Sequence, residues 1–215
     1  MAITEIIQFS VELDAQAPHT TVDNTIQKAA KALKGVKTPQ HFVFGTPIQD
    51  KGAVQITSEW DGVTDYANFE ASPEFSSFIS TLRSTYGSPQ SIFHVALDRS
   101  AFGAGLATAP VVEYVQTSFP VSRVTPAFQK QIEADFSRFD EIYKKGATGN
   151  LGWAFGWVLE ELDHDDVKGE KTKCFFVMRG WKSMRHFELS VQNDAYKESI
   201  PLLFAWNAPF KMVGG

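Results

Sequence analysis

The chain has 215 residues, a formal net charge of −5 and 43% apolar residues, among them 18 Phe and 5 Trp. This length fits one large domain or two domains of about 100 residues each. The 20 Lys and Arg residues are spread along the chain instead of clustered, which argues against a nucleic-acid-binding surface.

The cysteine content and the N-terminal sequence indicate the compartment. Cys174 is the only cysteine, so an intramolecular disulfide is excluded and a reducing compartment is favoured. The first residues, MAITEIIQFSVELD, alternate like a strand and lack the basic leader and apolar core of a signal peptide. No apolar run approaches the roughly 18 residues that a membrane-spanning helix needs. We therefore expect a cytoplasmic protein with neither nucleic acid nor membrane as a partner.

The first half of the chain reads as strand, helix, two strands, helix and strand. The β-branched, alternating segment ITEIIQFSVEL predicts the first strand. A helix is predicted over 21–35, where Ile26, Ala29, Ala30 and Leu33 share one face and Gly35 is the stop. The predicted elements that follow are strands QHFVFGT and AVQITSEW joined by the turn PIQDKG, a helix, and the strand QSIFHVAL. For that second helix we expect Asp61 as N-cap and a buried stripe of Phe75, Phe78, Ile79 and Leu82.

The second half repeats this order. Its strands are VVEYVQTSF, NLGWAFGWVLEE, TKCFFVMRGW and the short PFKMV. Its first helix is predicted to begin with Thr125 as N-cap and Pro126 at the first helical position, and to end at Gly146. Phe128, Ile132, Phe139 and Tyr143 are expected on the inner face of this helix.

An aromatic and apolar pattern recurs with an offset of 121 residues, which indicates an internal repeat. Val54, Ile56, Trp60, Tyr66, Phe75, Ile79 and Leu82 correspond to Phe175, Val177, Trp181, Phe187, Tyr196, Ile200 and Leu203. The order β-α-β-β-α-β in each half is that of a ferredoxin-like unit. The predicted fold is α+β, with a first unit at 1–99, a linker at 100–109 and a second unit at 110–215. One such unit leaves a sheet face bare, so we expect the two units to pack sheet to sheet.

These residues resemble the dimeric α/β-barrel superfamily, in its antibiotic-biosynthesis-monooxygenase-like and stress-responsive branches. The resemblance is carried by Trp60 at the end of a strand, followed by SPEF at 72–75; the second half keeps Trp181 but reads NDAY at 193–196. It implies a single-chain pseudo-dimeric α/β barrel.

The catalytic residues of those branches are matched only in part. The monooxygenase branch carries a His nine residues after the Trp, where this chain has Phe69 and Ser190. The polyketide cyclase of the stress-responsive branch uses a Tyr and a His on one helix, and the matching positions are Phe69 and Phe75 in the first half. In the second half they are Ser190 and Tyr196, so the resemblance leaves Tyr196 as a candidate acid or hydrogen-bond donor.

Polar residues on otherwise apolar strands are the further catalytic candidates, namely His94, His41 and Glu59. A buried carboxylate beside an imidazole would form an acid/base pair near neutral pH. The alternative is that His94 is a satisfied core or strand-end histidine and that Glu59 faces solvent.

The candidate substrate-binding residues are mainly aromatic: Trp60, Tyr66, Phe69, Phe75, Phe44, Arg179 and Trp181. Arg179, on a very apolar strand, would bind a carboxylate or phenolate or pair with an acidic neighbour. In GWAFGW (152–157) the glycine face would let another backbone or a flat ligand approach, while the aromatic face fits a core. The run EELDHDD (160–166) has no recognisable metal-ligand spacing and is interpreted as a solvated loop.

The sequence therefore predicts a cofactor-independent, metal-free enzyme for a hydrophobic aromatic or polyketide-like secondary metabolite. Its chemistry would be acid/base proton transfer leading to cyclisation, isomerisation or dehydration. Two alternatives stay open: a cofactor-free monooxygenase of the antibiotic-biosynthesis type, and a non-catalytic protein that binds a hydrophobic ligand. A homodimer is compatible with the sequence, which also leaves open which half holds the working pocket.

Overall fold

The computed structural model describes residues 2–10, 27, 31, 41–48 and 53–214 of the chain. The helix predicted over 21–35 lies outside these residues except for Gln27 and Lys31, as does most of the turn predicted at 47–52. No helix in the described part of the chain combines the length and the apolar character needed to cross a membrane.

The strands form one antiparallel sheet whose order, among the described residues, is β2-β3-β1-β4-β6-β7-β5-β8. The strands of the first unit are β1 (Ile3–Ser10), β2 (His41–Gly45), β3 (Ala53–Trp60) and β4 (Pro89–Leu97). Those of the second unit are β5 (Val111–Pro120), β6 (Asn150–Val158), β7 (Thr172–Trp181) and β8 (Phe210–Gly214). Each of the eight overlaps a strand predicted from the sequence.

The second helix of each unit is broken into two shorter helices. These are α2 (Val63–Glu70) and α3 (Pro73–Tyr86) in the first unit, and α5 (Met184–Ser190) and α6 (Asp194–Phe204) in the second. The break follows from new N-caps: Ser72 Oγ accepts from the Phe75 N–H at 3.2 Å, and Asn193 Oδ1 accepts from the Tyr196 N–H at 2.9 Å. The predicted N-cap Asp61 is wrong, because Gly62 occupies that position.

The long helix α4 (Pro126–Tyr143) begins as predicted, with Thr125 Oγ1 accepting from the Phe128 N–H at 3.2 Å. It ends three residues before the predicted Gly146. Lys144 is the C-cap, and the Gly146 N–H closes a turn onto the Tyr143 carbonyl at 3.0 Å. The glycine therefore marks the end of the turn that follows the helix.

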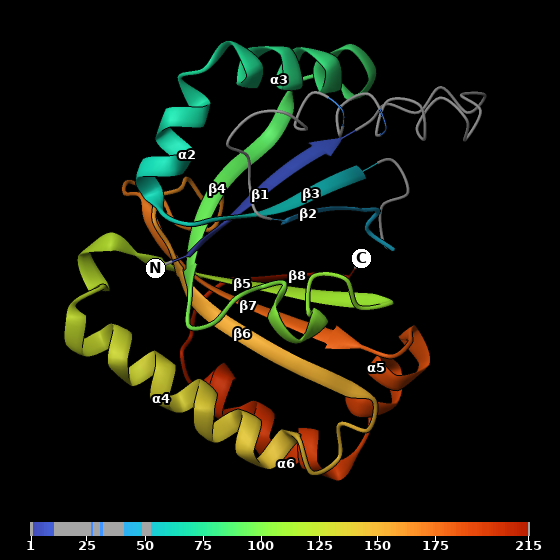
Figure 1. Ribbon diagram of the computed structural model, residues 1–215. Coiled ribbons are helices and arrows are strands. Elements are labelled where there is room, and N and C mark those ends of the chain that lie inside the picture. Colours follow the sequence, from blue (N-terminus) through green and yellow to red (C-terminus); the bar gives the residue numbers. More distant parts are fainter. Residues whose placement is uncertain (1, 11–26, 28–30, 32–40, 49–52, 215) are drawn as a thin grey trace.

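The two half-sheets face each other in the middle of the molecule, and the helices cover their outer faces (Figure 1). Along β1, Ile7 and Phe9 point to the core beneath α2 and α3, whereas Ile6 points to the core between the half-sheets. That middle core joins residues of both units, such as Phe93 from β4 and Phe176 from β7, whose rings lie 5.9 Å apart. The predicted α+β fold, two units packed sheet to sheet, is confirmed.

The repeated tryptophans occupy equivalent places. The rings of Trp60 and Tyr66 lie 5.7 Å apart at 74°, and those of Trp181 and Phe187 lie 6.0 Å apart at 72°. In both units the strand-end tryptophan therefore anchors the first short helix through an edge-on aromatic contact.

The half-sheets are joined where β4 pairs with β6, through Val95–Val158, Ala96–Trp157 and Leu97–Gly156. Gly156 lies so close to β4 that an added Cβ would stand 2.0 Å from the Ala96 carbonyl oxygen. The glycine face of GWAFGW thus admits another backbone, one of the two possibilities that the sequence left open. Its aromatic face, with Trp153, Phe155 and Trp157, packs on the core under α4.

Replacing Gly156 with alanine is expected to lower the free energy of unfolding by about 2 kcal/mol or more, because β4 and β6 must move apart. Chemical denaturation of the purified protein measures this. Gly45→Ala is the matched control, since nothing lies within 4 Å of a Cβ added there. Equal stability of the two variants would contradict the close approach of β4 and β6.

The segment between β4 and β5 contains a short 3-10 helix, Gly103–Gly105, and buries Ala101, Leu106 and Ala107 in the middle core. It therefore packs on both units. The division of the chain at 1–99, 100–109 and 110–215 stays a prediction.

Candidate functional site

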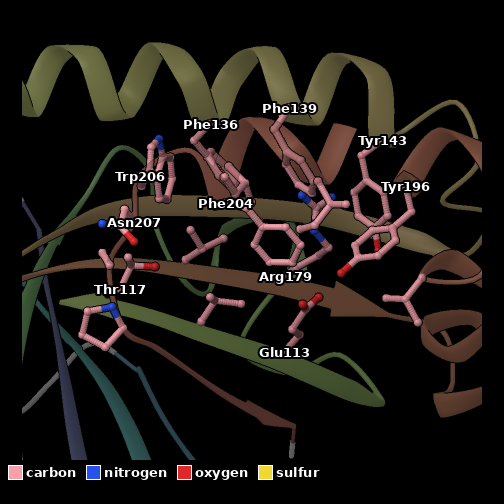
Figure 2. A pocket seen from close by; sticks show the side chains of 17 residues that line it. Glu113, Thr117, Phe136, Phe139, Tyr143, Arg179, Tyr196, Phe204, Trp206 and Asn207 are labelled. Atoms are coloured by element: carbon pink, nitrogen blue, oxygen red, sulfur yellow. The ribbon is translucent and has the colours of Figure 1, made fainter. Parts of the chain in front are cut away.

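A cavity of about 480 Å³ lies in the second unit, between the outer face of its half-sheet and the helices α4 and α6 (Figure 2). Its walls are mostly apolar, from Val115, Phe136, Val177, Ile200, Leu203 and Trp206. Its polar groups include Glu113, Thr117, Tyr143, Arg179, Tyr196 and Asn207. A mostly apolar pocket with a few convergent polar groups is typical of a small-molecule site.

Glu113 projects into this cavity from β5 (Figure 2). One carboxylate oxygen, Oε2, accepts a hydrogen bond of 3.0 Å from the indole N–H of Trp181. Burial raises the pKa of Glu113, and the nearby Arg179 charge and the Trp181 hydrogen bond offset only part of this effect. Glu113 is therefore a stronger base than an exposed glutamate.

Arg179 is the register partner of Glu113 on β7 and is 3% exposed. Its Nη2 donates to Asp140 Oδ1 on α4 at 2.7 Å, and its guanidinium lies 4.9 Å from the centre of the Tyr143 ring. Asp140 Oδ2 accepts a second hydrogen bond of 2.7 Å, from the Trp153 indole. Nη1 of Arg179 is buried and has no hydrogen-bond partner among the described residues. Asp140 thus holds the guanidinium from the side of α4, and Arg179 contributes a positive charge to the lining of the cavity.

Tyr196 reaches the cavity from the first turn of α6, which the Asn193 cap positions. Its hydroxyl points toward the Glu113 carboxylate (Figure 2). Burial, and then the negative charge of Glu113, raise the pKa of Tyr196, so this hydroxyl stays protonated and can donate. The cavity thus combines a carboxylate base, a guanidinium cation and a phenolic donor.

The first unit contains an equivalent carboxylate, Glu5 on β1. Its Oε2 accepts from the Trp60 indole at 3.2 Å and from the Ser58 hydroxyl at 2.6 Å. Ser58 occupies the place of Arg179, because the register pairs are Glu5–Ser58 and Glu113–Arg179. Beside Glu5 the first unit places His94, which is 6% exposed and whose Nδ1 is hydrogen-bonded to Glu160.

Glu59 and His94 do not form the acid/base pair that the sequence suggested, because their side chains lie on opposite faces of the half-sheet. Glu59 is buried and accepts hydrogen bonds of 2.8 Å from the Ser100 hydroxyl and the Ala101 N–H. It therefore binds the linker between the units, and the alternative that it faces solvent is wrong. His41 is exposed, and its ring lies 5.2 Å from that of Phe102.

The aromatic residues proposed for substrate binding separate into two groups. Trp60, Tyr66, Phe69, Phe75 and Phe44 all belong to or pack on the core beneath α2 and α3. In the second unit, Arg179 and Tyr196 line the 480 Å³ cavity. Trp181 donates a hydrogen bond to Glu113, which lines the same cavity.

The sequence patterns do not single out the carboxylates around Arg179, namely Glu113 and Asp140, or those around His94, namely Glu5 and Glu160. A signal for Glu5 and Glu113 existed, since ITEIIQFS (3–10) and VVEYVQTS (111–118) place Glu, Gln and Ser at the same three positions. The sequence predicts a solvated loop at Glu160, but the Glu160 carboxylate accepts a hydrogen bond from the His94 backbone N–H at 2.9 Å. Across the described residues, no group of three His, Cys, Asp or Glu side chains could hold a metal ion.

No protein-family model matches the sequence, and no functionally curated protein is detectably similar to it. Solved structures are similar over 99% of this chain. One is an anthrone oxidase-like protein, 16% identical with 90% of its chain covered and a TM-score of 0.59. Candidate monooxygenases of Fusobacterium nucleatum and Lactobacillus acidophilus are 13% and 10% identical, with 90% and 92% of their chains covered and TM-scores of 0.60 and 0.59. The chain therefore has the same fold as these structures, with two ferredoxin-like units fused in one polypeptide.

Proposed function

We propose that the protein is a cofactor-independent enzyme that removes a proton from an acidic carbon of a hydrophobic small molecule in the cavity of the second unit. The observation that carries this proposal is geometric: Glu113, Arg179 and Tyr196 line one cavity whose walls are mostly apolar. Burial there raises the pKa of Glu113, which favours it as the base. Among the candidates named from the sequence, Tyr196 and Arg179 belong to this site, whereas His94, His41 and Glu59 do not line it.

The proposed step uses three side chains. Glu113 accepts the proton from carbon, and the negative charge that develops on the substrate's conjugated oxygen is stabilised by the positive charge of Arg179. The Tyr196 hydroxyl can donate a hydrogen bond to the same oxygen. The apolar walls exclude water and hold an aromatic or polyketide-like substrate, which favours cyclisation, isomerisation or dehydration after proton removal.

A cofactor-free oxygenase is the second candidate, and the fold favours it, because the similar structures include candidate monooxygenases and an anthrone oxidase-like protein. Proton removal would be the shared first step. The substrate carbanion would then add molecular oxygen, and the resulting peroxide anion would take back the proton held by Glu113 to form a hydroperoxide. Loss of water, which removes the second hydrogen of that carbon, would leave a carbonyl there. The substrate carbon is oxidised and oxygen is reduced, with one oxygen atom retained and one leaving as water.

The test incubates the purified protein with an anthrone and with a panel of polyphenolic 1,3-diketones. Substrate hydrogen exchange in D₂O is followed by NMR without oxygen, and oxygen uptake is followed in air. Enzyme-dependent exchange without oxygen uptake supports the proton-transfer enzyme, and uptake of one O₂ per substrate supports the oxygenase. Tight ligand binding with neither exchange nor uptake would overturn both and identify a binding protein.

A further inference from the structure

The buried Glu5 of the first unit is not used by the chemistry proposed for the second. Both described donors to its carboxylate, Ser58 Oγ and Trp60 Nε1, bind the same oxygen, Oε2. Oε1 is buried and has no hydrogen-bond partner among the described residues. One oxygen of a 3% exposed carboxyl group is therefore left for a proton or a ligand.

His94 is the register partner of Glu5 on β4. Its Nε2 lies 3.8 Å from Glu5 Oε1 and is likewise buried without a hydrogen-bond partner in the described part of the chain. The other ring nitrogen, Nδ1, is hydrogen-bonded to Glu160, which comes from the second unit just after β6. The Glu160 side chain is 37% exposed. Glu160, His94 and Glu5 thus lie in a row that leads from solvent to the buried carboxyl group of Glu5.

The surroundings keep this row in place. The Tyr66 ring from α2 lies 3.9 Å from the imidazole, and the His94 backbone N–H donates to Glu160 Oε2 at 2.9 Å. Burial alone would raise the pKa of Glu160, but the hydrogen bonds from His94 lower it. Burial raises the pKa of Glu5; the hydrogen bonds from Ser58 and Trp60 and the nearby His94 offset only part of this effect, and Glu70 of α2 adds to it. The outer carboxylate is therefore poised to be charged while the inner one is poised to hold a proton.

We propose that His94 and Glu160 relay protons between solvent and Glu5, which makes Glu5 the acid/base group of a second site in the first unit. In the outward step, the O–H bond of Glu5 breaks as its proton moves to Nε2 of His94. The Nδ1–H bond breaks as that proton moves to Glu160, which releases it to water. One proton crosses the row and no group is oxidised or reduced.

The 3.8 Å between Glu5 Oε1 and His94 Nε2 sets what the inner transfer requires. Direct transfer needs Nε2 and Oε1 to approach by about 1 Å, whereas a ligand hydroxyl could bridge them at hydrogen-bond distance from both. Where the second unit has Arg179, the first has the uncharged Ser58. Glu5 therefore lacks the cation that Glu113 has opposite it on the neighbouring strand.

Hydrogen–deuterium exchange of the Glu5 carboxyl group tests the relay. The C=O stretching band of the protonated Glu5 carboxyl group is identified by infrared spectroscopy as the band that is absent from Glu5→Gln. The time that this band takes to shift after the protein is mixed with D₂O gives the exchange rate. Exchange is expected to slow at least tenfold in His94→Gln and in Glu160→Gln. Glu161→Gln is the matched control, since Glu161 is the exposed neighbour of Glu160, and its exchange rate should equal that of the unchanged protein.

If His94 and Glu160 only held the two units together, replacing them should speed the exchange of the Glu5 carboxyl group, because water would then reach Glu5 more easily. Unchanged or faster exchange in both variants would therefore overturn the relay. The ¹⁵N shifts of His94 in the unsubstituted protein give a test that needs no variant to fold. They should show a proton on Nδ1 in the neutral ring, as transfer to Nε2 requires, whereas a neutral ring protonated at Nε2 overturns the proposal.

Discussion

Replacing Glu113 with glutamine is expected to lower kcat/KM for the proposed reaction by about 10²- to 10⁴-fold, the usual contribution of a positioned general base. Glutamine keeps the shape of the side chain and can still accept from the Trp181 indole, but it cannot take a proton from carbon. The measurement is initial-rate kinetics with whichever substrate shows exchange or oxygen uptake. Glu141→Gln is the matched control, because Glu141 is exposed on the neighbouring helix α4.

The pH dependence of the rate has a defined sign. Because the pKa of Glu113 is raised, kcat/KM should fall as the pH is lowered through a value above 4.5, the ordinary value for a glutamate. A rate that is independent of pH from 4.5 to 8, or full activity of Glu113→Gln, would exclude Glu113 as the base.

The same substitution should make the protein more stable at neutral pH. A folded-state pKa above the unfolded value means that the folded protein binds the proton more tightly, so the stability contributed by the protonated group is present at low pH. It is lost as the pH rises through the folded pKa. Each pH unit between the two values corresponds to about 1.4 kcal/mol. Thermal denaturation from pH 4 to 8 should therefore show a smaller decline for Glu113→Gln than for the unsubstituted protein.

Replacing Asp140 with alanine is expected to lower the free energy of unfolding by about 3–5 kcal/mol, because it leaves the buried Arg179 guanidinium without its ion-pair partner. It also removes the acceptor of the Trp153 indole. Urea denaturation measures the loss. Glu141→Ala is the control on the same helix, and it should change stability by no more than about 0.5 kcal/mol.

A second substitution separates loss of the ion pair from loss of packing. In the double variant Asp140→Ala with Arg179→Met, the unpaired charge is absent, so its stability should exceed that of Asp140→Ala alone. A double variant that is less stable than Asp140→Ala would show that the guanidinium contributes more through its contacts with Tyr143 than it loses by burial.

The candidate site was only partly predictable, as Arg179 and Glu59 show. Arg179 stands out in the sequence because it is charged and lies near the end of a very apolar strand, where it would bind a carboxylate or phenolate or pair with an acidic neighbour. In the structure it pairs with Asp140 on the helix α4. Glu59 was paired with an imidazole on the same kind of argument, yet it binds the linker at Ser100 and Ala101. Composition along one strand indicates that a buried charge needs a partner, but it does not identify that partner.

The sequence by itself determined the strands, the repeat and the packing of two units, because alternation of apolar residues and recurrent tryptophans are local properties of the chain. It also carried the paired Glu5 and Glu113, at the same position of ITEIIQFS and VVEYVQTS. Only the tertiary structure decided that Glu113 meets Arg179 and Tyr196 in a cavity, whereas Glu5 meets His94 and Glu160. The physical reason is that these groups come from strands and helices far apart in sequence, so their distances are set by sheet register and helix packing and not by spacing along the chain.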